Sequence, residues 1–122
     1  MKKYFTMSEL CKSSSHPELA AQSIPLTVAE NLSSLCFHIL QPLREAMGFP
    51  VVITSGYRPK ALNKAVGGVP NSWHLTGQAA DIDCGRERNR KIYDWLNTHR
   101  KELPIRELLW EGNGRWVHVA IG

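Results

Sequence analysis

Two histidines and one aspartate have the residue types that could hold a catalytic metal ion. His74 and Asp81 are separated by a short segment that contains Gly77, and His118 lies far along the chain. Two imidazoles and one carboxylate suit zinc, and three protein ligands leave a fourth position open for the water of a hydrolytic reaction. Spacing alone is weak evidence, because a histidine on an apolar strand is more often an ordinary core residue. The three residues therefore define a hypothesis of a single zinc site.

Three short motifs surround these residues and follow one another in a fixed order. They are S-G-Y-R-P at 55–59, S-W-H-L-T-G-Q-A-A-D-I at 72–82 and W-V-H-V at 116–119. The spacing S-x-H-x-x-G-x-A-x-D is the most specific part. The chain resembles the M15 peptidase family, in its small subgroup related to D-Ala-D-Ala carboxypeptidases and phage endolysins. The resemblance covers residues 51–121, and the N-terminal third fits more loosely.

This resemblance implies a fold, a cofactor and residue roles. The fold would be the α+β hedgehog/DD-peptidase fold, and a single Zn²⁺ would be held by His74, Asp81 and His118. The reaction would be hydrolysis of peptide bonds in peptidoglycan or its precursors. The family's catalytic arginine falls on Arg58, where it would stabilise developing negative charge or hold a substrate carboxylate. A planar guanidinium suits that role because it can grip a carboxylate or an oxyanion through two donors.

Several neighbours of these residues have two interpretations. Asp83 would project from the same strand face as Asp81 and so competes with it as a ligand. The family pattern favours Asp81, and a solvent-facing or supporting role is simpler for Asp83. Ser72 could hydrogen-bond near the site or cap the following turn. Trp73 and Trp116 could line a substrate groove, and core packing is the alternative.

One position departs from the family pattern. Members commonly carry the catalytic glutamate three residues before the last histidine, where this chain has Arg115. The nearest acid is Glu111. With a two-residue turn at the Asn-Gly pair, Glu111 would project from the same hairpin face as His118, so we predict that it is the general base. A one-residue change of register would reverse its direction, and Asp83 or Glu107 would then be the alternatives.

Local patterns predict the elements that position these residues. Thr6 and Glu9 have capping-box spacing, as do Thr27 and Glu30 before a helical run of apolar residues that ends at Gly48. The order indicates an α+β fold, with helices packed on a small antiparallel sheet. The expected elements are helices at 7–13, 27–47, 59–66 and 87–101, strands at 51–54 and 79–83, and a terminal hairpin of strands 105–111 and 116–121 around a turn at 113–114.

Length and composition fit one globular domain over residues 1–122. The chain has 122 residues, of which 43% are hydrophobic and 21% charged, close to the average for soluble proteins. The sequence contains neither an apolar run long enough to cross a membrane nor the apolar region of a Sec signal near its start. The three cysteines are widely spaced and odd in number, so we expect reduced thiols rather than a disulfide framework.

The charge favours an anionic partner without naming it. The formal net charge is +4, and the basic residues are scattered except for a group at 86–91. A solvated helix face explains that group, and no nucleic-acid recognition motif accompanies it. We therefore expect peptidoglycan or its peptide precursors as the partner, no nucleic acid, no membrane insertion and a monomeric protein.

Together these features predict a zinc peptidase that acts on peptidoglycan stem peptides. Both a murein endopeptidase and a D-Ala-D-Ala carboxypeptidase fit the sequence. Without a Sec signal we expect cytoplasmic synthesis, and action on the wall then fits a phage or prophage lysin released by a separate pore. The alternative is a catalytically impaired, zinc-containing cell-wall-binding module, of which a displaced glutamate would be the signature.

Overall fold

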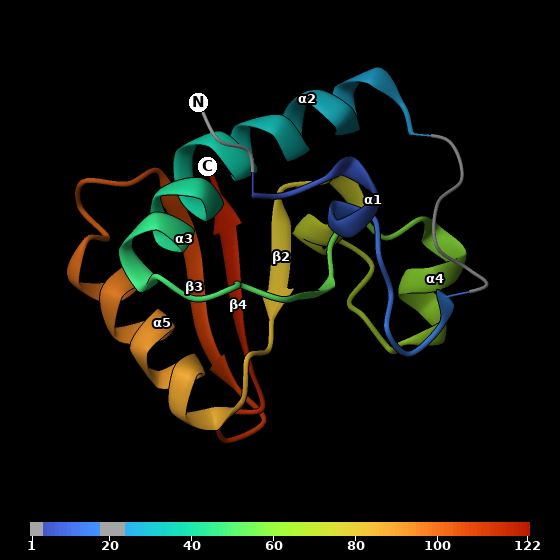
Figure 1. Ribbon diagram of the computed structural model, residues 1–122. Coiled ribbons are helices and arrows are strands. Elements are labelled where there is room, and N and C mark those ends of the chain that lie inside the picture. Colours follow the sequence, from blue (N-terminus) through green and yellow to red (C-terminus); the bar gives the residue numbers. More distant parts are fainter. Residues whose placement is uncertain (1–3, 18–23) are drawn as a thin grey trace.

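The fold is a four-stranded antiparallel sheet with helices packed against it, which confirms the α+β prediction. The computed structural model describes residues 4–17 and 24–122. The strands follow the spatial order β1-β2-β4-β3 (Figure 1). Their bounds are Ile53–Ser55 for β1, Ala79–Ile82 for β2, Ile105–Glu111 for β3 and Trp116–Ile121 for β4.

The helices lie around this sheet. A continuous helical segment crosses one end of it, α5 lies beside β3, and α4 lies on the opposite side of the molecule (Figure 1). The continuous segment consists of α2, a π-helical stretch η2 and α3, and it ends at Gly48, whose φ of 73° is readily adopted by glycine. The bounds are Met7–Leu10 for α1, Leu26–Leu35 for α2, Cys36–Leu40 for η2, Gln41–Met47 for α3, Lys60–Ala65 for α4, Trp73–Thr76 for the 3₁₀ helix η3 and Arg86–Thr98 for α5.

The two predicted capping boxes have different outcomes. The box of Thr6 and Glu9 is present at the start of α1, although that helix is shorter than expected. The box at Thr27 is wrong, because α2 begins at Leu26 with Pro25 as its N-cap and without a side-chain cap. Thr27 already lies inside the first turn and so cannot cap it. The segment at 13–25, which the sequence predicts to be irregular, lies partly outside the described residues.

Alternation along the strands separates the core from the site. Val117 and Val119 of β4 join the hydrophobic core with Leu108 of β3, and all three are buried. His118 lies between the two valines and pairs with Asp81 of β2, so both project from the opposite face. One face of the sheet is therefore apolar, and the other carries ionisable residues.

The terminal hairpin has the expected register but a different turn. Trp116 pairs with Glu111 and His118 pairs with Leu109, as predicted. The expected two-residue turn at 113–114 is wrong. Gly112 and Asn113 have φ values of 56° and 55°, as the central residues of a type I′ turn require. A side chain at Gly112 would also meet the Trp116 ring at 2.7 Å, so glycine fits this position on two grounds.

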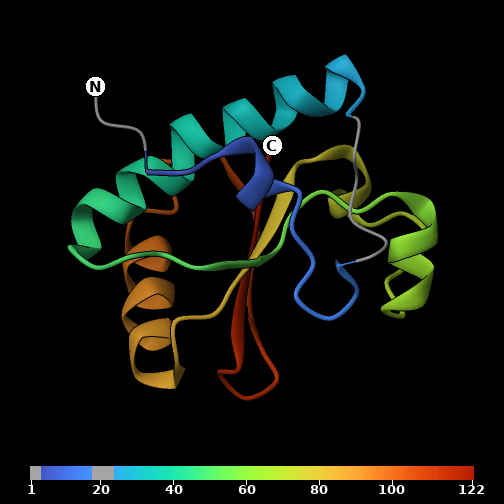
Figure 2. The ribbon, with the colours of Figure 1, turned by 45° about the vertical axis from the view of Figure 1, so that its right-hand side comes forward.

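A buried asparagine fixes the hairpin turn to α5. Asn89 is fully buried, and its Nδ2 donates to the carbonyl oxygens of Gly114 at 2.9 Å and Arg115 at 3.2 Å. The same nitrogen donates to Asp83 Oδ1 at 3.0 Å. Figure 2 shows this turn at the end of the molecule away from α2. The strand ends that flank the site are thereby held to the body of the protein.

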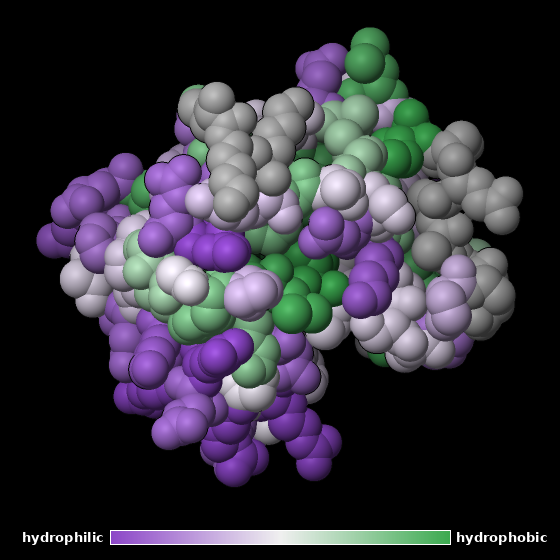
Figure 3. Space-filling model, in the orientation of Figure 1, coloured by the Kyte–Doolittle hydropathy of each residue, from purple (hydrophilic) through white to green (hydrophobic). Residues whose placement is uncertain are grey.

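The basic segment at 86–91 forms the start of α5 and is mainly exposed. Hydrophilic side chains gather over the part of the surface where α5 lies (Figure 3). Arg90 pairs with Asp94 one turn later at 3.3 Å, with both side chains more than half exposed. This arrangement agrees with a solvated helix face. Among the described residues, no helix has the length and apolar character needed to span a membrane.

Candidate metal centre

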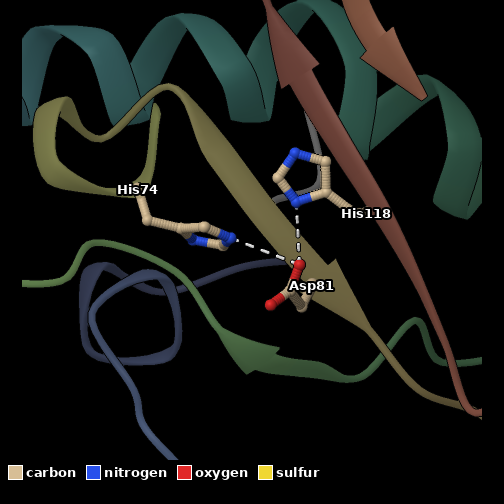
Figure 4. A group of neighbouring side chains, drawn as sticks. All are labelled: His74, Asp81 and His118. Carbon is tan, nitrogen blue, oxygen red and sulfur yellow. Dashed lines mark hydrogen bonds and ion pairs between the residues drawn. The ribbon is translucent and has the colours of Figure 1, made fainter. Parts of the chain in front are cut away.

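The three predicted metal ligands converge on one point. One possible ligand atom from each of His74, Asp81 and His118 lies within 4.8 Å of the others. Figure 4 shows both imidazoles directed at the same carboxylate oxygen. His74 Nε2 lies 3.2 Å from Asp81 Oδ1, and His118 Nδ1 lies 3.0 Å from the same atom. Residues 44 positions apart in the sequence thus share one cluster.

The ligands reach the cluster from two kinds of local structure. Asp81 and His118 are directly opposite on β2 and β4, where strand register fixes their relation. His74 lies instead in the short helix η3, whose N-cap Ser72 accepts a hydrogen bond from the His74 amide at 3.1 Å. Gly77 ends that helix with a φ of 76° and returns the chain towards β2. The spacing between His74 and Asp81 therefore corresponds to one short helical turn followed by the start of strand β2.

The second nitrogen of each imidazole is held by an acceptor. His74 Nδ1 donates to the carbonyl oxygen of Gly56 at 2.8 Å. His118 Nε2 lies 2.6 Å from Glu107 Oε1. Metal-binding histidines usually donate their other ring nitrogen in this way, because the bond fixes the tautomer and the ring orientation. The bonds leave His74 Nε2 and His118 Nδ1 facing Asp81.

These contacts fit a zinc ion held by the three side chains. Zinc takes nitrogen and oxygen ligands at about 2.0 to 2.2 Å, so that tetrahedral ligands lie roughly 3.3 Å apart. The distances of 3.2 Å and 3.0 Å from Asp81 Oδ1 to the two imidazole nitrogens are close to that separation. His74 and His118 are buried with exposed fractions of 2% and 9%, and Asp81 is 8% exposed. The donor set, the spacing and the ring orientations agree with zinc.

Arg58 lies next to the cluster and supports it. Its guanidinium donates from Nε to Ser55 Oγ at 3.0 Å, from NH1 to Asn63 Oδ1 at 3.3 Å and from NH2 to Asp81 Oδ2 at 3.0 Å. A side chain at Gly68 would overlap the amide oxygen of Asn63, so glycine allows the loop to close over this pair. Arg58 is therefore fixed by three acceptors beside the proposed ligand Asp81.

The pKa values of Asp81 and His118 are shifted in opposite directions. Burial alone would raise the pKa of Asp81, but hydrogen bonds and charge from His118 and His74 outweigh it and hold that pKa well below its usual range. Burial would lower the pKa of His118, and its contacts with Asp81 and Glu107 raise it instead. The carboxylates of Asp81 and Glu107, one beside each ring nitrogen of His118, thus favour the protonated form of this imidazole.

A cavity of about 500 Å³ opens beside the cluster. His74, Asp81, His118 and Arg58 form part of its lining. Trp73 and Trp116, predicted to bind substrate, also line it, and the ring of Trp73 lies 4.0 Å below the guanidinium of Arg106. Both tryptophans are partly exposed. A substrate in this cavity would contact the proposed ligands and both indole side chains.

The two glutamates of β3 flank the cavity. Glu111 and Glu107 both line it, and both project from the same face as His118, because each lies two residues from Leu109, which pairs with His118. Glu107 contacts His118 directly, a contact that sequence reasoning did not predict. Arg115 lies in the exposed turn and, in the described part of the chain, does not belong to the cavity lining. Glu111 therefore lies nearer the chemistry than position 115 does.

The two remaining candidates, Asp83 and Ser72, support local structure. Asp83 does not join the metal cluster within the described residues. Its Oδ1 accepts from the amide of Gly85 at 3.0 Å and from Asn89, so it supports the start of α5. Ser72 caps η3, as the second of its two interpretations held. The expectation that Asp83 projects from the same strand face as Asp81 does not apply, because β2 ends at Ile82.

Comparison with known proteins identifies the family of this chain. The family model described as Peptidase M15 matches residues 3–120, and the chain belongs to that family. It is similar to the zinc D-Ala-D-Ala carboxypeptidase of Streptomyces albus G, with 33% identity over 87 residues. The match covers 68% of this chain and 32% of that relative, so the chain corresponds to about a third of the relative's length. The resemblance inferred from the motifs is confirmed.

Proposed function

We propose that this protein is a zinc peptidase that hydrolyses peptide bonds in the stem peptides of bacterial peptidoglycan or its precursors. The observation that carries the proposal is the convergence of His74, Asp81 and His118 at one wall of a cavity, in a chain of the Peptidase M15 family. The name of the Streptomyces relative supports both the metal and the D-alanine-containing substrate.

The roles of the chain's own residues follow from their positions. A zinc ion held by the three ligands would polarise the scissile carbonyl and lower the pKa of a water molecule to near 7. Glu111 would take a proton from the attacking water and pass it to the leaving amine. Arg58 uses three of its five donors on protein acceptors, which leaves two for a substrate carboxylate or a developing oxyanion. Trp73 and Trp116 would hold the peptide on either side.

The two candidate reactions differ in what Arg58 contacts. In a carboxypeptidase it would bind the terminal carboxylate of D-alanine, and amidation of that carboxylate would abolish cleavage. In an endopeptidase it would bind the oxyanion, and cross-linked stem peptides would be cut. Zinc-supplemented protein should therefore be incubated with free pentapeptide, its C-terminal amide and cross-linked dimers, and the products identified by mass spectrometry.

A substitution at Glu111 tests the mechanism. Glu111→Gln keeps the shape and removes the basicity, so it should retain zinc and stability while abolishing hydrolysis. Glu102→Gln on the exposed surface is the matched control and should keep full activity. Hydrolysis by Glu111→Gln would transfer the role of base to another acid. A parent protein that cleaves none of these peptides, nor intact sacculi, would refute the enzymatic proposal and favour a wall-binding module.

We extend the proposal to the protein's setting. It would be made in the cytoplasm, reach the wall after a separate release step and act there as a monomer. An anionic wall polymer suits its formal net charge of +4. Fractionation of producing cells before and after lysis, together with light scattering of the purified protein, would test both points.

A further inference from the structure

We propose that Glu107 is a positioning residue that holds the imidazole of His118 in its metal-binding orientation. The inference rests on the proposed zinc site and adds a residue to it. It is carried by the distance of 2.6 Å between Glu107 Oε1 and His118 Nε2, which is shorter than the hydrogen bonds from His74 and His118 to Asp81 and from His74 to Gly56.

The location of this contact excludes Glu107 as a fourth ligand in the same arrangement. His118 Nδ1 faces Asp81 Oδ1 at 3.0 Å, and Nε2 faces Glu107 on the other edge of the ring. A metal ion among the three ligands would lie on the Nδ1 side. Glu107 would then act through His118, by accepting a hydrogen bond from Nε2–H, which keeps the proton on Nε2 and leaves the Nδ1 lone pair directed at the metal.

The strand register explains why Glu107 can reach this position. Leu109 lies directly opposite His118, so Glu107 and Glu111 are its two diagonal neighbours on one face. Strand twist makes the two diagonals unequal, and the observed contact is with Glu107. A register shift lies between Ile105 and Glu107, near the start of β3. Glu107 is thus the first regularly paired residue of β3 after this irregularity.

The partial exposure of Glu107 makes the inference testable without unfolding the protein. Its side chain is 39% exposed, whereas that of His118 is 11% exposed. Replacing Glu107 removes an acceptor at the rim of the cavity and leaves the apolar face of the sheet intact. His74 has the equivalent acceptor in the carbonyl oxygen of Gly56, which no side-chain substitution removes.

The test compares zinc affinity in Glu107→Leu, Glu107→Gln and the control Glu102→Leu, measured by competition with a chromophoric chelator. Loss of an acceptor that orients a ligand typically lowers metal affinity by about 10-fold to 100-fold. We expect that loss in Glu107→Leu. Glu107→Gln should recover most of the affinity, because its amide oxygen still accepts a hydrogen bond from Nε2–H. Glu102→Leu should match the parent, since Glu102 is exposed outside the cavity lining.

Imidazole nitrogen NMR gives a second readout that a merely structural role would not move. In zinc-loaded parent and Glu107→Gln, His118 should be protonated at Nε2 and metal-bound at Nδ1. In Glu107→Leu this pattern should weaken or become mixed. A Glu107→Leu affinity within twofold of the parent would overturn the inference. Equal losses in the leucine and glutamine variants would also overturn it, since charge rather than the hydrogen bond would then be responsible.

The outcome is separable from that of the proposed hydrolysis. A parent that binds zinc but cleaves no peptide refutes the enzymatic proposal, while the affinities of the variants still decide the role of Glu107. A parent that binds no zinc refutes both.

Discussion

The two sides of the metal centre are built by different means. On the sheet side, Asp81 and His118 face each other across β2 and β4, and Glu107 extends the same face onto β3. On the loop side, His74 is positioned by a 3₁₀ turn and by the carbonyl oxygen of Gly56. Regular strand pairing fixes the first side, and individual hydrogen bonds with close backbone contacts fix the second.

This difference shows where each side is sensitive to substitution. On the sheet side the backbone is held by a ladder of hydrogen bonds, so side chains can be exchanged with little movement of their neighbours. On the loop side, Gly56 lies where an added Cβ would overlap the carbonyl oxygen of Leu10. A small steric change there must move the backbone that orients His74. We therefore expect sheet-side variants to change chemistry and loop-side variants to change structure as well.

The largest expected effect is loss of zinc from His118→Ala on the sheet side and His74→Ala on the loop side. Each variant lacks one of three protein ligands and should lose most of its metal by elemental analysis. A free zinc concentration of 100 times the Kd would raise the unfolding free energy of the parent by about 2.7 kcal/mol. Chelation should therefore lower the Tm of the parent and barely change that of either variant. Full zinc content in both variants would refute the ligand assignment.

The next effect is on turnover in Arg58→Lys. Lysine preserves the charge but cannot reproduce the guanidinium fork that contacts Ser55, Asn63 and Asp81. Loss of one donor at a developing oxyanion typically costs about 100-fold to 1000-fold in kcat. Zinc content and Tm should remain close to those of the parent. Activity within a few-fold of the parent on stem peptides would remove Arg58 from the mechanism.

The comparison between the two sides is sharpened by Gly56→Ala, with Gly67→Ala as its control. Overpacking costs about 1 to 3 kcal/mol of unfolding free energy, and Gly56→Ala should also weaken zinc binding by shifting the acceptor of His74. At Gly67 an added Cβ meets nothing within 4 Å, but φ is 72°. That variant should lose about 1 to 2 kcal/mol from backbone strain and keep its zinc affinity. Denaturation curves and chelator competition measure both quantities, and equal zinc affinity in the two variants would contradict the loop-side argument.

The smallest expected effect is a pH dependence of opposite sign in the metal-free and zinc-loaded proteins. The raised pKa of His118 stabilises the metal-free fold fully below the unfolded value of about 6.5, and this contribution is lost as pH rises through the folded pKa. Zinc requires the unprotonated imidazole, so its affinity should increase over the same interval. The depressed pKa of Asp81 acts at the acid end, where stability is lost as pH falls below about 3.9 towards its folded value.

Thermal melts with zinc and with chelator across pH 5 to about 9 would measure the two slopes. Parallel slopes would show that His118 is not the group that couples proton and metal binding. His118→Asn provides a matched variant, because it removes the titrating ring while it keeps a polar side chain at the same strand position.

The sequence by itself predicted most of the elements and the three residues that converge in one cluster. Strand alternation and the hairpin signal predicted both strands of the terminal hairpin and its register, which depend on a period of two, but they misplaced the turn, which is centred on Gly112 and Asn113. The motif around His74 and Asp81 identified the family, which the family model confirms. Local signals were weaker at helix ends, where Thr27 had the right spacing for a cap but Pro25 began the helix.

Tertiary structure alone decided how the remaining residues act. Glu107 and Glu111 are equivalent by alternation, and the three-dimensional course of the strands brings only Glu107 within hydrogen-bonding distance of His118 among the described contacts. Likewise, no sequence pattern indicated that the Gly56 carbonyl oxygen would accept a hydrogen bond from His74, which lies 18 positions away in the sequence. Contacts between distant segments depend on twist, loop closure and packing of the whole chain, which spacing along the sequence does not encode locally.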